Sequence, residues 1–281
     1  MAANTFPTTK AALIANVAQR ELEFQAKLLQ SVRNVSSFAV PGSKSISFPK
    51  LTSFIVEDRA FGAAAPSDQV LTDTEDTILL NKNKIVKWII DAKDDVQTSL
   101  NNTTETVKRA ASALSRQVDT DIQAVLEAAG QVEATAVGAI TRDIILEMRE
   151  TLLNAEAIES QMTLIVGNDQ EKELLKIAEF NNQDIYGPNN MVRLGQIGSL
   201  YGMPVIRRSN LGAATYYMLD SDGVGFGWQA AVAMDSQKDV DYGSGSMKHV
   251  MDMLYGTAGL QLGEGPTAGP TESELIVKDA N

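Results

Sequence analysis

The stretch Gly195-Gln-Ile-Gly-Ser-Leu-Tyr-Gly-Met-Pro-Val-Ile-Arg-Arg-Ser-Asn210 carries the pattern that decides the fold of this chain. Its apolar residues between 197 and 207 predict a strand that glycines interrupt. A strand–helix unit precedes it, because Met162-Thr-Leu-Ile-Val166 is a short apolar run typical of a buried strand and a helix is predicted after it, towards Phe180. A Gly-x-x-Gly with a nearby valine is common, so the order of these elements is more specific than any one residue.

The strongest helix signal lies upstream of this unit. Between residues 103 and 129, apolar side chains recur three or four positions apart, and Gly130 is a plausible stop. Asn102 with Glu105 fits the spacing of a capping box. At about 1.5 Å per residue the helix would be about 40 Å long, long enough to be the spine of a flat domain.

Other elements are predicted on either side of the strand at 162–166. A second apolar stripe over 140–153, with Thr141 near its start, predicts another helix. Asn168 with Glu171 again has capping-box spacing, which predicts that Asn168 opens the following helix.

Short strands are predicted towards the C-terminus. Residues 215–219 and 224–228, separated by Asp222-Gly223, suggest a hairpin. Residues 230–234 and 248–255 predict two further strands, and 274–277 is the last apolar run.

Residues 38–92 are the least ordinary part of the sequence. Ser45-Ile-Ser-Phe48 alternates polar and apolar side chains, and residues 77–80 and 84–90 predict further strand. Between them, 57–76 contains no convincing element, which is uncommon inside a compact domain. The strands could form an extended ribbon of about 40 Å whose tip lies on another subunit. The alternative is a hairpin folded back on its own sheet.

Composition sets outer limits on the fold. The chain has 281 residues, 44% of them hydrophobic, which suffices for one large domain or two closely connected ones. No apolar run reaches 18 residues, so no membrane span is predicted. An imperfect apolar stripe over residues 8–30 predicts an N-terminal helix, and the residues before it lack the features of a secretory signal. Cysteine is absent, which removes disulfides, zinc–thiolate sites and thiol nucleophiles.

The net charge of −12 has two interpretations. It could serve solubility alone. It could also suit the wall of a container that should not adhere to packed nucleic acid, because duplex-binding proteins neutralise phosphates with Lys and Arg and this chain has the opposite sign. Composition does not separate the two.

Three features of the sequence resemble parts of catalytic or phosphate-binding sites. His249 is the single histidine, and neither a placed nucleophile nor a third group accompanies it, so a surface or packing role is predicted. Gly243-Ser-Gly245 is too short for a nucleophile elbow. Gly223-Val-Gly-Phe-Gly227 is followed by Trp228 and a strand-like run rather than by a helix, so it predicts a hairpin and not a phosphate-binding loop.

Acidic residues cluster at Asp73-Thr-Glu-Asp76 and at 91–95. Neither cluster has the alternating ligands, the glycine and the terminal glutamate of a calcium loop, so exposed loop charge is predicted. If the ribbon tip touches a neighbour, the first cluster could meet basic residues such as Arg207 and Arg208 of that neighbour.

The order of elements resembles the major capsid proteins of tailed bacteriophages, whose fold is named after phage Hong Kong ninety-seven. The resemblance covers nearly the whole chain and implies an α+β capsid fold with an N-terminal arm, an extended β-ribbon loop, a long spine helix in a peripheral domain and a mixed α/β axial domain. The expected boundaries are 1–39 for the arm, 40–92 for the extended loop, 93–137 and 243–281 for the peripheral domain, and 138–242 for the axial domain.

The resemblance implies a structural major capsid protein that assembles into pentamers and hexamers of an icosahedral shell around double-stranded phage DNA. It implies no catalysis, so no catalytic, cofactor-binding or metal-ligating residue and no cofactor is predicted. An encapsulin-like compartment holding a cargo enzyme is the alternative with the same fold. A small α/β enzyme is the alternative of a different class, and it lacks a placed catalytic set.

The partners expected from the resemblance are further copies of the chain, a portal protein, a possible decoration protein and packaged DNA in non-specific proximity. The arm before the ribbon is short, so a separate scaffolding protein is expected rather than a fused segment. No membrane partner is predicted. The expected location is the virion capsid, assembled in the bacterial host cytoplasm.

Overall fold

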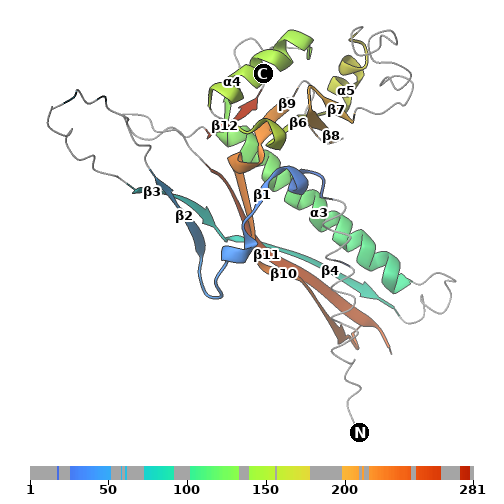
Figure 1. Ribbon diagram of the computed structural model, residues 1–281. Coiled ribbons are helices and arrows are strands. Elements are labelled where there is room, and N and C mark those ends of the chain that lie inside the picture. The colour runs from blue at the N-terminus through green and yellow to red at the C-terminus, as the bar shows by residue number, and fades with distance from the viewer. Residues whose placement is uncertain are drawn as a thin grey trace.

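The structure is a computed structural model, and it combines a long helix, two sheets and a projecting two-stranded ribbon (Figure 1). It describes residues 18, 26–51, 58, 61, 73–91, 102–132, 139–155, 157–177, 198–208, 211, 215–241, 245–260 and 273–278. The predicted helix at 8–30 lies largely outside these residues. The side chain of Asn102, on which the predicted capping box depends, is also outside what the structure describes.

The helices follow the predicted stripes closely. The long helix α3 spans Asn102–Ala129, α4 spans Arg142–Asn154 and α5 spans Asn168–Leu174. The described residues also include four short 3₁₀ turns: η1 (Leu28–Ser31), η2 (Ser36–Phe38), η3 (Glu159–Gln161) and η5 (Ser221–Gly223).

The strands form two sheets and a separate pair. The four-stranded sheet has the order β1-β10-β11-β4, the six-stranded sheet has the order β5-β12-β9-β6-β8-β7, and β2 pairs with β3 alone. The strand bounds are β1 Arg33–Asn34, β2 Ser45–Leu51, β3 Asp73–Leu79, β4 Lys82–Ile90, β5 Gly130–Val132, β6 Met162–Val166, β7 Ser199–Leu200, β8 Met203–Arg207, β9 Tyr216–Asp220, β10 Val224–Lys238, β11 Met247–Gly259 and β12 Ser273–Lys278.

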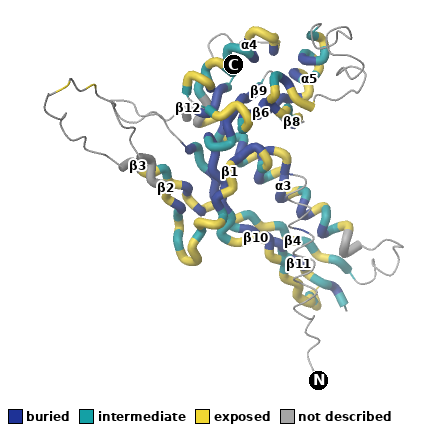
Figure 2. Tube along the Cα trace, viewed as in Figure 1, coloured by how far each residue is buried: buried dark blue, intermediate teal, exposed yellow. Residues whose placement is uncertain are grey.

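The four-stranded sheet is covered on one face by α3. Its strand β4 alternates between partly buried and exposed positions, as a strand with one covered face must. The helix supplies a matching aliphatic stripe to the same core. That stripe consists of Val107, Ala110, Ala111, Leu114, Val118, Ile122 and Leu126. Figure 2 shows that buried residues lie where α3 meets the sheets.

The six-stranded sheet carries α4 and lies at the other end of the molecule in Figure 1. Its strand β6 is buried at every position, and it pairs in parallel with β8 and antiparallel with β9. The strand at 203–207, which lies within the stretch Gly195–Asn210, is therefore adjacent to the strand at 162–166. Thr141 caps α4 by accepting a hydrogen bond from the backbone N–H of Ile144, which confirms its predicted place at the helix start.

The ribbon of β2 and β3 packs on its own chain at its root. The two strands pair in register from Ser45↔Leu79 to Leu51↔Asp73. A small core of Val35, Ile46, Ile78, Leu80 and Leu260 fixes the end of the ribbon near the sheet. Beyond that core the ribbon projects away from the rest of the chain in Figure 1.

Several local predictions were wrong. Strands β9 and β10 do not form a hairpin, because β9 belongs to the six-stranded sheet and β10 to the four-stranded sheet, with η5 between them. Residues 230–234 are not a separate strand but part of the irregular strand β10, whose register shifts between Trp228 and Ala233. Asn168 does not cap α5, since Gly167 occupies the N-cap position and no side chain accepts a hydrogen bond there.

The C-terminal strand β12 pairs with β9 and β5 in the six-stranded sheet. The predicted α+β fold class is confirmed by this mixture of helices and sheets.

Candidate functional site

Two glycines of the run 223–227, Gly225 and Gly227, form a flat seat for the ribbon root rather than a phosphate loop. They lie at the start of β10, not before a helix. A Cβ built on Gly225 would collide with the side-chain ends of Ile78 and Leu260, and one on Gly227 would lie 2.9 Å from Cδ1 of Ile46. Ile46 and Ile78 come from the two ribbon strands, so these glycines exist where ribbon side chains approach the sheet backbone.

Gly256 on the neighbouring strand β11 completes this seat. A Cβ on Gly256 would meet the backbone carbonyl oxygen of Leu79, closer than Cβ atoms are found in real structures. The ribbon root therefore lies on a surface of three glycines, Gly225, Gly227 and Gly256, which we call the glycine seat. Sequence reasoning excluded the phosphate loop but did not find this packing role.

His249 is a packing histidine, which is one of the two roles predicted for it; the other was a surface position. Its side chain is only 6% exposed, on the face of β11 that points towards α3. Its Nδ1 lies 2.7 Å from Oγ of Ser236, and its ring stacks on Trp88 with centroids 5.3 Å apart. Burial lowers the pKa of His249.

We expect the stability of the chain to fall as the pH decreases through about 6.5, the ordinary pKa of histidine. Because the folded-state pKa is lowered, the unfolded chain binds the proton first, and stability falls from that pH down to the folded-state pKa. The slope is at most about 1.4 kcal/mol per pH unit. Urea unfolding at several pH values would measure it in the natural chain and in His249→Gln.

The contribution of His249 is the difference between the two chains. The histidine is the chain's single one, so few other groups titrate in this range. Asp119, whose pKa is raised, acts in the opposite sense, since its contribution is present at low pH and is lost as the pH rises. Identical pH dependence of the two chains would contradict the assigned role of His249.

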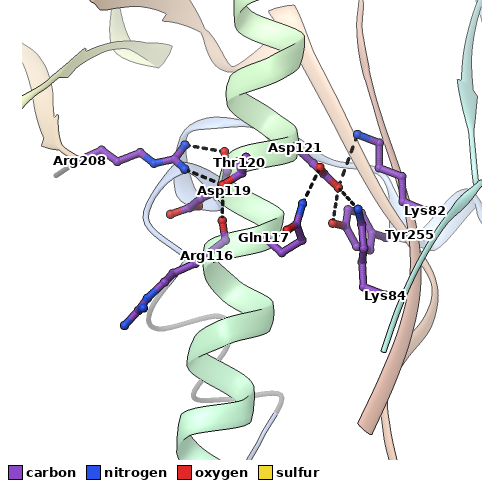
Figure 3. Close-up of polar contacts among 9 residues, drawn as sticks. All are labelled: Lys82, Lys84, Arg116, Gln117, Asp119, Thr120, Asp121, Arg208 and Tyr255. Carbon is purple, nitrogen blue, oxygen red and sulfur yellow. Dashed lines mark hydrogen bonds and ion pairs between the residues drawn. The ribbon is translucent and has the colours of Figure 1, made fainter. Parts of the chain in front are cut away.

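A second group of polar contacts involves residues 116–121 of α3, a segment of rather less than two turns that we call the polar turn (Figure 3). On one side, Asp119 accepts a hydrogen bond at Oδ1 from the backbone N–H of Leu28, 3.1 Å away. Arg208 reaches the same side from the end of β8, and it donates to the carbonyl oxygen of Asp119 at 2.6 Å and to Oγ1 of Thr120 at 3.1 Å. Asp119 and Arg208 are 7% and 6% exposed.

The opposite side of the polar turn faces the four-stranded sheet. Asp121 accepts a hydrogen bond from the hydroxyl of Tyr255 on β11 at 2.6 Å. Nζ of Lys84 and of Lys82, both on β4, lie 3.3 Å and 3.7 Å from the same carboxylate oxygen. Gln117 donates to the other oxygen at 3.0 Å. Figure 3 shows these groups converging on Asp121 while the side chain of Arg116 points away from them.

The two aspartates of the polar turn are in different electrostatic states. Burial raises the pKa of Asp119, although the charge of Arg208 and the hydrogen bond from Leu28 oppose it. Burial acts on Asp121 too, but the hydrogen bonds from Tyr255 and Gln117 and the charges of Lys82 and Lys84 outweigh it and lower its pKa. Burial also lowers the pKa of Arg208, and burial with the bond to Asp121 raises that of Tyr255.

The predicted meeting of the ribbon's acidic cluster with Arg207 and Arg208 of a neighbour is wrong for Arg208. That side chain is buried within its own chain and bonded to the polar turn, because a guanidinium is tolerated inside when its donors are satisfied. Arg207 is half exposed but forms an ion pair with Glu171 at 2.9 Å. Of the acidic cluster itself, Glu75 is exposed.

No other chemical site emerges from the described part of the chain. It contains no group of three or more His, Asp or Glu side chains placed to hold a metal ion. Asp91 of the second acidic cluster accepts a hydrogen bond from Ser246 at 3.4 Å, and residues 94 and 95 lie outside the described ranges. Among the helices that the structure describes, none combines the length and the apolar character needed to cross a bilayer.

Two isoleucines are exposed among charged side chains on the outer face of β4. On β4, Ile85 and Ile89 point away from α3 and are 53% and 36% exposed. Exposed Lys87 lies between them, and Val250 and Asp252 are the β11 partners of Lys87 and Ile85.

The family comparison agrees with this architecture. The sequence model of a family described as "Phage capsid protein" matches residues 15–262. No curated protein matches the chain in sequence.

Several solved structures share the fold. A chain from Mycobacterium phage Che8 superposes with a TM-score of 0.72 at 18% identity, covering 90% of both chains. The capsid structure of the cyanophage P-SCSP1u gives 0.68 at 13% identity, covering 89% of this chain and 86% of that one. The mature capsid of bacteriophage PhiM1 gives 0.63 at 14% identity, with coverage of 89% and 86%. At these identities the likeness shows the fold.

Proposed function

Because the chain belongs to the phage capsid protein family, and is therefore a structural, non-enzymatic major capsid protein of the virion, we propose that its copies close into pentamers and hexamers of an icosahedral shell around double-stranded phage DNA. The observation that carries the proposal is the family match over residues 15–262. The match does not favour the encapsulin-like alternative.

The domain division is part of the proposal. We assign the four-stranded sheet and α3 to the peripheral domain and the sheet of β6, β8 and β9 with α4 to the axial domain. The separate cores of the two sheets support this division. The pairing of β12 with β9 supports moving residues 273–278 from the peripheral to the axial domain.

The ribbon is proposed to lie on a neighbouring copy. Among the described residues, its side chains pack on the rest of their own chain at the root core and the glycine seat. A two-stranded ribbon is marginally stable in water, so a partner surface would stabilise the part beyond the root. Contacts of this kind are heterologous, since one surface meets a different surface of the next copy, and such contacts close into rings.

The remaining partners are proposed from the family. A scaffolding protein, a portal protein and a possible decoration protein would act during or after assembly in the host cytoplasm, and packaged DNA would lie close to the shell without specific contacts. The net charge of −12 fits the absence of strong adhesion to phosphates.

We expect the purified chain, expressed with and without a candidate scaffolding protein, to form closed shells, rings of five or six copies, or tubes in electron micrographs. The reason is that heterologous surfaces associate until they close or polymerise. Analytical ultracentrifugation at several salt concentrations would give the size distribution. A uniform monomer or dimer under every condition would contradict the assembly proposal. Shells that hold protein cargo and exclude DNA in infected cells would favour the encapsulin-like alternative.

A further inference from the structure

The polar turn joins three parts of the chain that are remote in sequence. Leu28 lies before the first strand, Arg208 follows β8, and Tyr255 lies on β11, yet all three hydrogen-bond to residues 119–121 of α3. Asp119 and Asp121 are two residues apart, so they project from nearly opposite sides of the helix at almost the same height. One turn of α3 is therefore held by polar contacts from both of its sides.

The apolar contacts of α3 do not by themselves define one position of the helix. Its buried side chains Val107, Ala111, Leu114, Val118 and Ile122 are spaced three or four apart. If the helix moved along its axis by one turn, each of these positions would coincide with the place of the next one, about 5 Å away. Apolar burial is non-directional, so it discriminates between these positions mainly through differences in side-chain size.

The polar contacts distinguish the observed position of α3 from a position displaced by one turn much more strongly than the apolar contacts do. Hydrogen bonds require short distances and near-linear geometry, and those of the polar turn lie between 2.6 and 3.1 Å. A one-turn movement would break all of them together and leave Asp119 and Arg208 buried without partners, which is costly.

We propose that the polar turn sets the register of α3, so that the long helix has a single axial and rotational position between the four-stranded and six-stranded sheets. Its main contribution is a unique subunit geometry rather than added stability, because the desolvation of the buried Asp119 and Arg208 costs about as much as their polar contacts return. This inference concerns the single chain and does not depend on whether the chain builds shells.

The test uses the absence of cysteine, which permits clean spin labelling. Labels at Ala113→Cys on α3 and Lys87→Cys on β4, both exposed positions, report the placement of the helix by pulsed electron spin resonance. Labelled chain is mixed with a large excess of unlabelled chain, so that only distances within one copy are measured. The test variant replaces both buried charges with apolar side chains, Asp119→Leu with Arg208→Met. The matched control is Arg109→Met, an exposed arginine on the same helix without a polar partner among the described residues.

We expect one narrow distance distribution in the natural chain and in the control. The test variant is expected to show a broadened distribution or a second population displaced by about 5 Å, with its thermal midpoint unchanged to within about 5 °C. A single narrow distribution in the test variant overturns the proposal, whatever its thermal midpoint. If that variant does not fold, Asp121→Asn with Tyr255→Phe, which weakens the contacts on the other side of the polar turn, decides by the same distance criterion.

Discussion

Replacing residues 52–72 with an Asn-Gly turn is expected to give a folded chain that no longer assembles. Leu51 and Asp73 face each other in register, so a two-residue turn can close the shortened hairpin. The root core and the glycine seat are untouched, and the circular dichroism spectrum and thermal midpoint should be retained. If each contact between neighbouring copies loses about 3 kcal/mol of binding free energy, the concentration needed for association rises by about 100-fold. Sedimentation velocity and electron microscopy would measure the loss.

A second variant separates the length of this segment from its side chains. It replaces 52–72 with a Gly/Ser segment of the same length, and it should fold and also fail to assemble if the side chains make the contact. Normal shells from the shortened chain would refute the placement of the ribbon on a neighbour. That result would favour a hairpin that serves its own subunit.

The second large effect is expected from Gly256→Ala in the glycine seat. The added Cβ would collide with the backbone carbonyl oxygen of Leu79, and a backbone atom cannot rotate aside as a side-chain end can. The ribbon root would have to move away from β11, and overpacking of this kind costs about 3 kcal/mol. Urea unfolding of the purified chain would measure the loss of unfolding free energy.

Two other glycines provide graded comparisons. Gly225→Ala should cost less than Gly256→Ala, because the atoms it meets are the ends of the Ile78 and Leu260 side chains. Gly198→Ala should change the unfolding free energy by no more than about 0.5 kcal/mol, because no other atom lies within 4 Å of its added Cβ. Equal stability of the Gly256→Ala and Gly198→Ala chains would show that the ribbon does not need the glycine seat.

Elements with a strong local period were predictable from the sequence. The long helix was predicted at 103–129 and spans Asn102–Ala129, and the buried strand at 162–166 was predicted with its observed ends. Periodicity works here because each element buries one face, and the side chains on that face recur at the period of the element.

The pairing of strands was less predictable. Two short strands separated by Asp222-Gly223 have the local pattern of a hairpin, yet β9 and β10 join different sheets. The choice depends on which distant strands compete for each edge, and β10 pairs with β11 along most of its length. Local turn chemistry cannot reveal that competition.

The polar turn was missed for a related reason. Asp119 and Asp121 lie in a helix rich in charged residues, where a solvated face is the ordinary interpretation. A usable signal existed, because Asp119 follows Val118 and precedes Ile122 on the apolar stripe, and a carboxylate at such a position requires a partner. The partners themselves, Leu28 and Arg208, are 91 and 89 residues away in sequence.

The sequence by itself determined the succession of helices and strands, and through that succession it predicted the capsid family to which the chain belongs. Periodicity and turn residues act over a few positions, so they are legible without a structure. Only the tertiary structure decided that the glycine run seats the ribbon, that β12 joins the six-stranded sheet and that Arg208 is buried on the polar turn. Each of these depends on contacts between segments far apart in the chain. Such contacts contribute to stability only after the cores of the two sheets have formed.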